Sequence, residues 1–114
     1  MADNTHQLIV AKMNPHDAGA VADIFAKSDS SELPGLIGVR QRTLFNFHDL
    51  YFHLVEADHN FSPALYKARS HPLYAEINQR LAEFISPYDP NWKEPKDAMA
   101  TPFYTWAADN RGQQ

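Results

Sequence analysis

The residues best suited to chemistry stand inside an apolar stretch, RQRTLFNFHDLYFHLVEAD, at residues 40–58. Arg40 and Arg42 open this stretch, and His53 follows later in it. An arginine offers a planar set of N–H donors that suits a negatively charged oxygen. A histidine can take up and release a proton near neutral pH. A histidine can also be a hydrogen-bonded core residue, and arginines can also lie on a solvated strand edge. The residue types alone therefore leave both a catalytic and a structural role open.

The stretch predicts a β-hairpin that brings these polar side chains together. Residues 36–47 and 50–56 are strand-like, and the two residues between them form the expected turn. Because side chains alternate along a strand, Arg40 and Arg42 share one face with His53 and Tyr51, unless a one-residue bulge shifts the register. The other face carries apolar side chains, namely Phe45, Phe47, Leu50, Phe52 and Leu54.

The remaining elements follow from periodicity and from turn residues. We predict a strand over 6–13, a helix over 15–27, a turn over 28–35, a short helix within 60–70, a helix within 70–86, an irregular segment over 86–97 and a last strand within 98–109. This β-α-β-β-α-β order predicts an α+β ferredoxin-like fold, with a four-stranded antiparallel sheet and helices on one face. The second sheet face then needs a partner, which favours a homodimer.

Composition limits the classes of function. The 114 residues fit one domain, 1–114, with a core of about 6–108. A formal net charge of -4 gives no basic surface for nucleic acid, and the absence of cysteine excludes disulfides and thiolate chemistry. The polar start MADNTHQ lacks a signal sequence, and no apolar run could cross a bilayer, so we expect a cytoplasmic protein with no membrane partner.

Several longer motifs carry a resemblance to a known family. They are SDSSELPGLIGVRQRTLFNFHDLYFHLVEAD at 28–58, LYKARSHPLYAEIN at 65–78 and PFYTW at 102–106. In this order they resemble the polyketide synthesis cyclases of the tetracenomycin type, which are small enzymes of bacterial aromatic polyketide assembly. The resemblance implies a dimeric α/β barrel that uses neither a metal nor an organic cofactor.

The resemblance also implies a set of site residues. Its acid/base and anion-binding positions correspond here to Asp29, Arg42 and His53, and Arg40 matches a further family arginine. Some members carry a histidine just before the aspartate, whereas this chain has Ser28. A mechanism that needs a second histidine beside the aspartate therefore does not carry over.

Aromatic side chains near these positions are candidates for contact with a flat substrate. We expect Tyr51, Phe25, Phe52 and Trp106 to contribute, although aromatic residues at such spacing are more often core. The proline-rich segment 86–97 is either a lid over the cavity or a packed connection.

The function implied is cofactor-free closure of a ring in a partly cyclised aromatic poly-β-ketone, by intramolecular aldol condensation and dehydration. His53 would be the acid/base, Arg42 the oxyanion donor, and Asp29 an orienting group or a second base. Two alternatives stay open: a cofactor-free anthrone-type monooxygenase, and a non-catalytic protein that steers spontaneous cyclisation. The substrate is a small-molecule polyketide intermediate, and transient contact with polyketide synthase components is also open.

Overall fold

Four antiparallel strands form one sheet in the order β2-β3-β1-β4. They span His6–Met13 (β1), Val39–Phe47 (β2), Leu50–Ala57 (β3) and Ile85–Ser86 (β4). The structure is a computed structural model, and it describes residues 6–57, 62–93, 95–106 and 108. The order of strands and helices confirms the predicted α+β ferredoxin-like fold.

The central hairpin has the predicted turn and, over most of its length, the predicted register. Leu44 lies opposite His53, and His48 in the turn adopts a positive φ of 56°. The register shifts between Val39 and Gln41, so Arg40 is the extra residue of a bulge. The alternation that would have placed Arg40 beside Arg42 is therefore broken, which corrects the prediction for Arg40.

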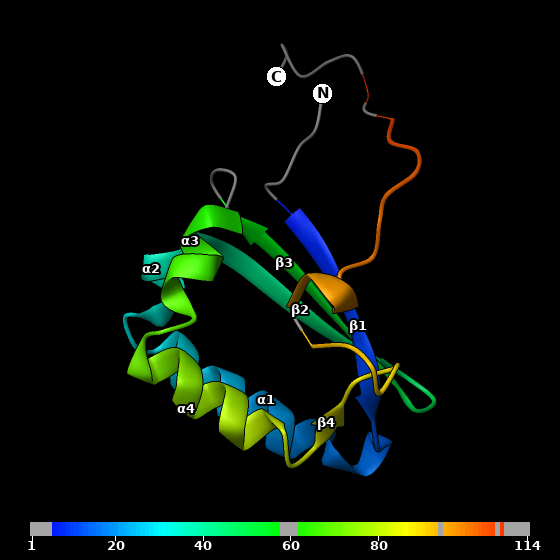
Figure 1. The fold of residues 1–114 in the computed structure, drawn as a ribbon. Helices are drawn as coiled ribbons and strands as arrows, with labels where there is room; N and C mark the ends of the chain where they lie inside the picture. Colours follow the sequence, from blue (N-terminus) through cyan, green and yellow to red (C-terminus); the bar gives the residue numbers. More distant parts are fainter. Residues whose placement is uncertain (1–5, 58–61, 94, 107, 109–114) are drawn as a thin grey trace.

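Helices cover one face of this sheet, with α1 and α4 side by side across it (Figure 1). Asn14 caps a 3-10 turn, Pro15–Asp17, by accepting a hydrogen bond from the His16 amide at 2.9 Å. This turn leads into α1, Ala18–Asp29. The later helices are α3, Ser62–Ala68, and α4, Pro72–Leu81.

The segment predicted as a turn at 28–35 is partly helical. Helix α1 continues through Asp29, and a short helix, α2, spans Leu33–Ile37. The sequence predicts Pro34 and Gly35 as turn residues and a strand from residue 36, but β2 begins only at Val39. A proline in the first turn and a glycine just past the end also delimit a short helix. Gly38 closes α2 with a φ of 90°, and its amide donates to the Pro34 carbonyl at 2.8 Å.

The last predicted strand, 98–109, is wrong over residues 101–106, and residues 107 and 109 lie outside the described residues. After a 3-10 turn, Pro95–Ala98, Met99 forms an isolated bridge with Ile9, and the Ala100 amide donates to the Leu8 carbonyl at 2.7 Å. Pro102 has no amide proton to continue such a ladder. Residues 101–106 are not in a strand, and in Figure 1 this segment leads away from the sheet.

The two sheet faces differ in what covers them. Tyr51, His53, Val55 and Ala57 of β3 are buried beneath the helices. On the opposite face, which we call the outer face, Phe45 is 50% exposed and Phe47 is 61% exposed. The alternation predicted for β3 and for most of β2 is thus confirmed, and the covered face carries the polar residues.

Candidate functional site

Strand β3 places two polar side chains on the covered face of the sheet. Tyr51 is 4% exposed and His53 is 8% exposed, and two residues of spacing point both in the same direction. Ile9 of β1 and Leu44 of β2 flank His53 on the neighbouring strands. A buried histidine among apolar neighbours needs a polar partner, since an unpaired polar group is costly to bury.

Arg42 is that partner. Its Nη1 lies 3.0 Å from Nε2 of His53. Its Nε donates to both carboxylate oxygens of Asp29 at 3.1 Å, and its Nη2 donates to Oδ1 at 2.7 Å. The structure therefore brings together the three predicted catalytic residues in one chain of contacts, Asp29–Arg42–His53.

Phe25 holds this arrangement from the side of α1. The guanidinium carbon of Arg42 lies 4.8 Å from the centre of the Phe25 ring, within the range of a cation–π contact. The same ring meets His53 edge-on, with 5.1 Å between ring centres. The Arg42 side chain is only 16% exposed, whereas that of Asp29 is 40% exposed, so the ion pair reaches from the covered face to the surface.

The contact with Arg42 fixes the protonation state of His53. An arginine can only donate, so Nε2 of His53 must accept, and a neutral ring then carries its proton on Nδ1. Burial, with the nearby Arg42 cation acting in the same direction, lowers the pKa of His53 to about 3. At neutral pH His53 is therefore uncharged, and its basic lone pair is occupied by Arg42.

Burial shifts the pKa of Tyr51 in the opposite direction, because the protonated form of a phenol is the neutral one. Burial raises the pKa of the Tyr51 phenol far above its usual range, although the Arg42 cation opposes this rise. The phenol stays protonated throughout the physiological range. It therefore presents an O–H donor beside the Arg42–His53 pair.

These side chains open into a cavity of about 450 Å3 between the sheet and the helices. Most of its wall is apolar, with Val55 from β3 and Ile77 from α4 among the lining residues. Phe25, Arg42, Tyr51 and His53 also line it, while further polar lining comes from Ser28, Arg69, Asn78 and Lys93. A volume in this range accommodates a ligand of several fused rings.

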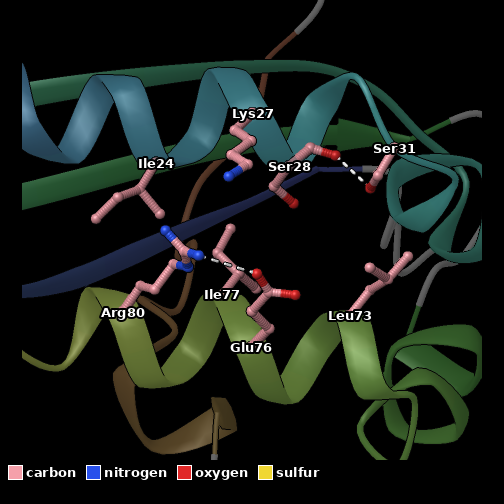
Figure 2. Close-up of a pocket in the computed structure, with 8 residues that line it drawn as sticks. All are labelled: Ile24, Lys27, Ser28, Ser31, Leu73, Glu76, Ile77 and Arg80. Atoms are coloured by element: carbon pink, nitrogen blue, oxygen red, sulfur yellow. Dashed lines mark hydrogen bonds and ion pairs between the residues drawn. The ribbon is translucent and has the colours of Figure 1, made fainter.

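A smaller pocket of about 130 Å3 lies between α1 and α4 (Figure 2). Its charged side chains belong to the helix surfaces, and Arg80 pairs with Glu76 one turn away at 3.2 Å. At its other end, Ser31 Oγ donates to the Ser28 carbonyl at 2.5 Å. Since its ionisable groups are exposed, and Glu76 and Arg80 pair with each other, we place the candidate site in the larger cavity.

Three predicted substrate contacts do not lie at this cavity. Arg40 is exposed at its bulge. Phe52 pairs with Val10 and Phe45, which puts it on the outer face. Trp106 is 72% exposed in the segment that leaves the sheet. Their predicted roles would require either another copy of the chain or a rearrangement.

Sequence reasoning missed several cavity residues. Asn78 and Leu81 of α4 line the cavity, as do Trp92 and Lys93 of the irregular segment. The sequence indicated that segment, with Trp92, as either a lid or a packed connection, but it gave no sign of the contact that Lys93 makes with the cavity. In the described part of the chain, no group of three or more histidine, aspartate or glutamate side chains could hold a metal ion, and no helix could span a membrane.

The fold and this donor-lined cavity define a small α+β domain suited to oxygen-rich, flat ligands, and comparison with known proteins identifies its family. The model for polyketide synthesis cyclases matches residues 5–107, so the chain belongs to the polyketide synthesis cyclase family. Its activity is that of a polyketide cyclase.

Individual relatives agree with this family assignment. Tetracenomycin F2 cyclase of Streptomyces glaucescens is 52% identical over 101 residues, which cover 89% of this chain and 93% of that protein. A solved structure of that type-II polyketide cyclase superposes with a TM-score of 0.84 at 51% identity, over 90% of this chain and 97% of the other. A polyketide synthase protein of Streptomyces cyaneus is 44% identical, over 91% of this chain and 98% of its own length.

More distant structures share the fold alone. A cofactor-independent oxygenase from Streptomyces nogalater has a TM-score of 0.52 at 18% identity, over 75% of this chain and 86% of its own. At this identity the likeness does not transfer the oxygenase reaction to this chain.

Proposed function

We propose that this single domain closes a later ring of a partly cyclised aromatic poly-β-ketone, by intramolecular aldol condensation and dehydration without a cofactor. One observation carries the proposal: the Asp29–Arg42–His53 chain of contacts places Arg42 and His53 at the wall of a mostly apolar cavity. Such a cavity can fold a flat, oxygen-rich chain, and a well-held intramolecular pair is worth about 7–11 kcal/mol.

The reaction requires a base and a site for negative charge. A methylene group between two carbonyls loses a proton, and the enolate carbon then attacks a second carbonyl of the same chain. Arg42 would hold the enolate oxygen, because two of its five N–H groups remain free of the contacts with Asp29 and His53. Asp29 would orient Arg42 by binding two of its nitrogens, since Asp29 itself does not line the cavity.

His53 would be the acid/base group, but it can accept a proton only after its contact with Arg42 is broken. Its lone pair on Nε2 is free only when Arg42 turns its Nη1 N–H toward another acceptor. An enolising substrate oxygen supplies that acceptor. The negative charge that develops on the substrate also favours a protonated His53, which opposes the effect of burial.

A homodimer would cover the outer face of the sheet. Phe45 and Phe47 stand exposed there on β2, and two sheets packed face to face would bury them. We expect light scattering to give twice the chain mass for the native protein and a single chain mass for Phe47→Glu. Gln79→Glu on the exposed side of α4 adds the same charge and should leave the dimer intact. An unchanged mass for Phe47→Glu would place the interface elsewhere.

The deciding experiment is co-expression with a minimal aromatic polyketide synthase and its earlier-acting cyclase, in cytoplasm, where we expect this protein to act. The products are compared by mass spectrometry and NMR with and without this chain. A new ring pattern at unchanged oxygen count supports the cyclase chemistry. An added oxygen atom would instead favour the oxygenase. If Arg42→Met and His53→Gln leave the ring pattern and its rate unchanged while substrate still binds, the protein only steers a spontaneous reaction.

A further inference from the structure

An aldol condensation with dehydration changes the charge on two oxygens, and the roles above provide for one of them. Arg42 serves the oxygen of the enolate that attacks. The enolate carbon attacks the carbon of a second carbonyl group, and the oxygen of that group gains a bond to hydrogen and later leaves as water. That second oxygen needs its own proton donor, placed beside Arg42 but separate from it.

Tyr51 meets this requirement. It is 4% exposed, lines the large cavity and lies two residues from His53 on the same face of β3, with 6.2 Å between the two ring centres. Within the described part of the chain, Tyr51 Oη has no hydrogen-bond partner. No fully buried side-chain oxygen in that part of the chain lacks such a partner, so Tyr51 Oη is not fully buried. The hydroxyl must therefore open to the cavity.

We propose, on the basis of the proposed function, that Tyr51 is a catalytic residue that donates its hydroxyl proton to the attacked carbonyl oxygen. His53 Nε2 takes one methylene proton, and the enolate carbon forms the new C–C bond. As the carbonyl π bond breaks, its oxygen takes the Tyr51 proton and becomes a hydroxyl group.

Dehydration then restores both residues. The C–O bond breaks, and the hydroxyl leaves as water with the proton held by His53. The tyrosinate removes the second proton of the original methylene carbon, which forms the C=C bond of the aromatic ring. One water is lost for each ring, and no other reactant is consumed.

The surroundings of Tyr51 fit both halves of this cycle. Burial raises the pKa of the phenol, so the proton is in place before substrate arrives, and the phenolate is a strong base once it forms. Arg42, the second influence on this pKa, stabilises the phenolate form. The ionisable residues that line the cavity with Tyr51 are Arg42, His53, Arg69, Tyr74 and Lys93.

The kinetic test is Tyr51→Phe, which removes one oxygen atom and keeps the ring. We expect ring closure of the polyketide released by a minimal synthase to slow by about 10²–10⁴-fold in kcat, the usual range for a general acid–base group. KM should change far less. Tyr88→Phe is the matched control, since Tyr88 is 55% exposed and lies outside the cavity. A kcat for Tyr51→Phe within twofold of the native value would overturn the proposal.

A spectroscopic test is independent of turnover. 2-Acetyl-1-naphthol with a ¹³C-labelled carbonyl is bound to the native protein and to Tyr51→Phe, and its carbonyl stretch is recorded by infrared difference spectroscopy. We expect a lower frequency in the native protein, because the Tyr51 O–H weakens the C=O bond. Equal frequencies would overturn the donor role even if the native protein closes rings. A Tyr51-dependent shift without ring closure by the native protein would uphold the donor and reject the proposed function.

Discussion

The burial of neutral His53 has a measurable effect on stability at acid pH. The unfolded chain binds a proton at His53 with a pKa of 6.5, whereas the folded chain binds it only near 3. Between these values the unfolded state is more protonated, so this site is neutral for stability above pH 6.5 and destabilises the fold as the pH drops. At pH 5 the loss amounts to about 2 kcal/mol relative to pH 7.5, and any folded-state pKa at or below about 4 gives the same value.

The assay is urea unfolding at pH 7.5, 6 and 5 for the native protein and for His53→Gln. A glutamine keeps an acceptor for Arg42 but does not titrate, so all other groups cancel in the comparison. We expect the native protein to lose about 2 kcal/mol more than His53→Gln between pH 7.5 and 5. Protein concentration must be held constant because association adds to apparent stability.

Parallel pH dependences in the two proteins would refute this reasoning. They would mean that His53 titrates alike in the folded and unfolded chains, and hence that neither burial nor Arg42 keeps it neutral. A long-range ¹⁵N–¹H NMR spectrum provides a direct check. We expect the proton of His53 on Nδ1 and an unprotonated Nε2 at pH 7.

Three further predictions concern activity and backbone geometry. Arg42→Met should slow ring closure by about 10²–10³-fold, the usual effect of losing an oxyanion donor, while Arg40→Met should not; equal losses would place both arginines in the site. Gly38→Ala should lower the free energy of unfolding by about 1–2 kcal/mol, because φ is 90° at this position. Gly35→Ala should not lower it, and equal urea midpoints for the two variants would contradict the left-handed cap at Gly38. Trp92→Ala should raise KM by roughly 2- to 10-fold with kcat nearly unchanged, and an unaltered KM in steady-state assays would exclude a substrate contact.

The sequence was sufficient for the parts of the fold that depend on local pattern. Alternation along β3 predicted which of its side chains share a face, and Asn14 followed by Pro15 predicted where the first helical turn begins. The two-residue turn at His48 predicted the pairing of Leu44 with His53. These features depend on residues that are close in the sequence, so a single sequence is enough to predict them.

The failures occurred where distant segments decide the structure. The bulge at Arg40 lies where β2 begins after α2, which contacts β2, and no local pattern in the sequence reveals it. The aromatic run that includes Trp106 has high strand propensity, but among the described residues its pairing with β1 ends at Ala100, and Pro102 has no amide proton to extend it. Likewise, Asp29 was assigned through family resemblance, and its contact with Arg42 depends on the extension of α1 past residue 27.

In the proposed mechanism, the position of Arg42 between Asp29 and His53 would keep the base blocked until substrate binds. With Asp29 on one side and His53 on the other, the guanidinium occupies the only lone pair that His53 could use as a base. A substrate oxygen that competes for Nη1 removes this block and is itself the oxygen that needs the cation. The same event would therefore stabilise the enolate and release the base that forms it, whereas an apolar ligand of equal size would do neither.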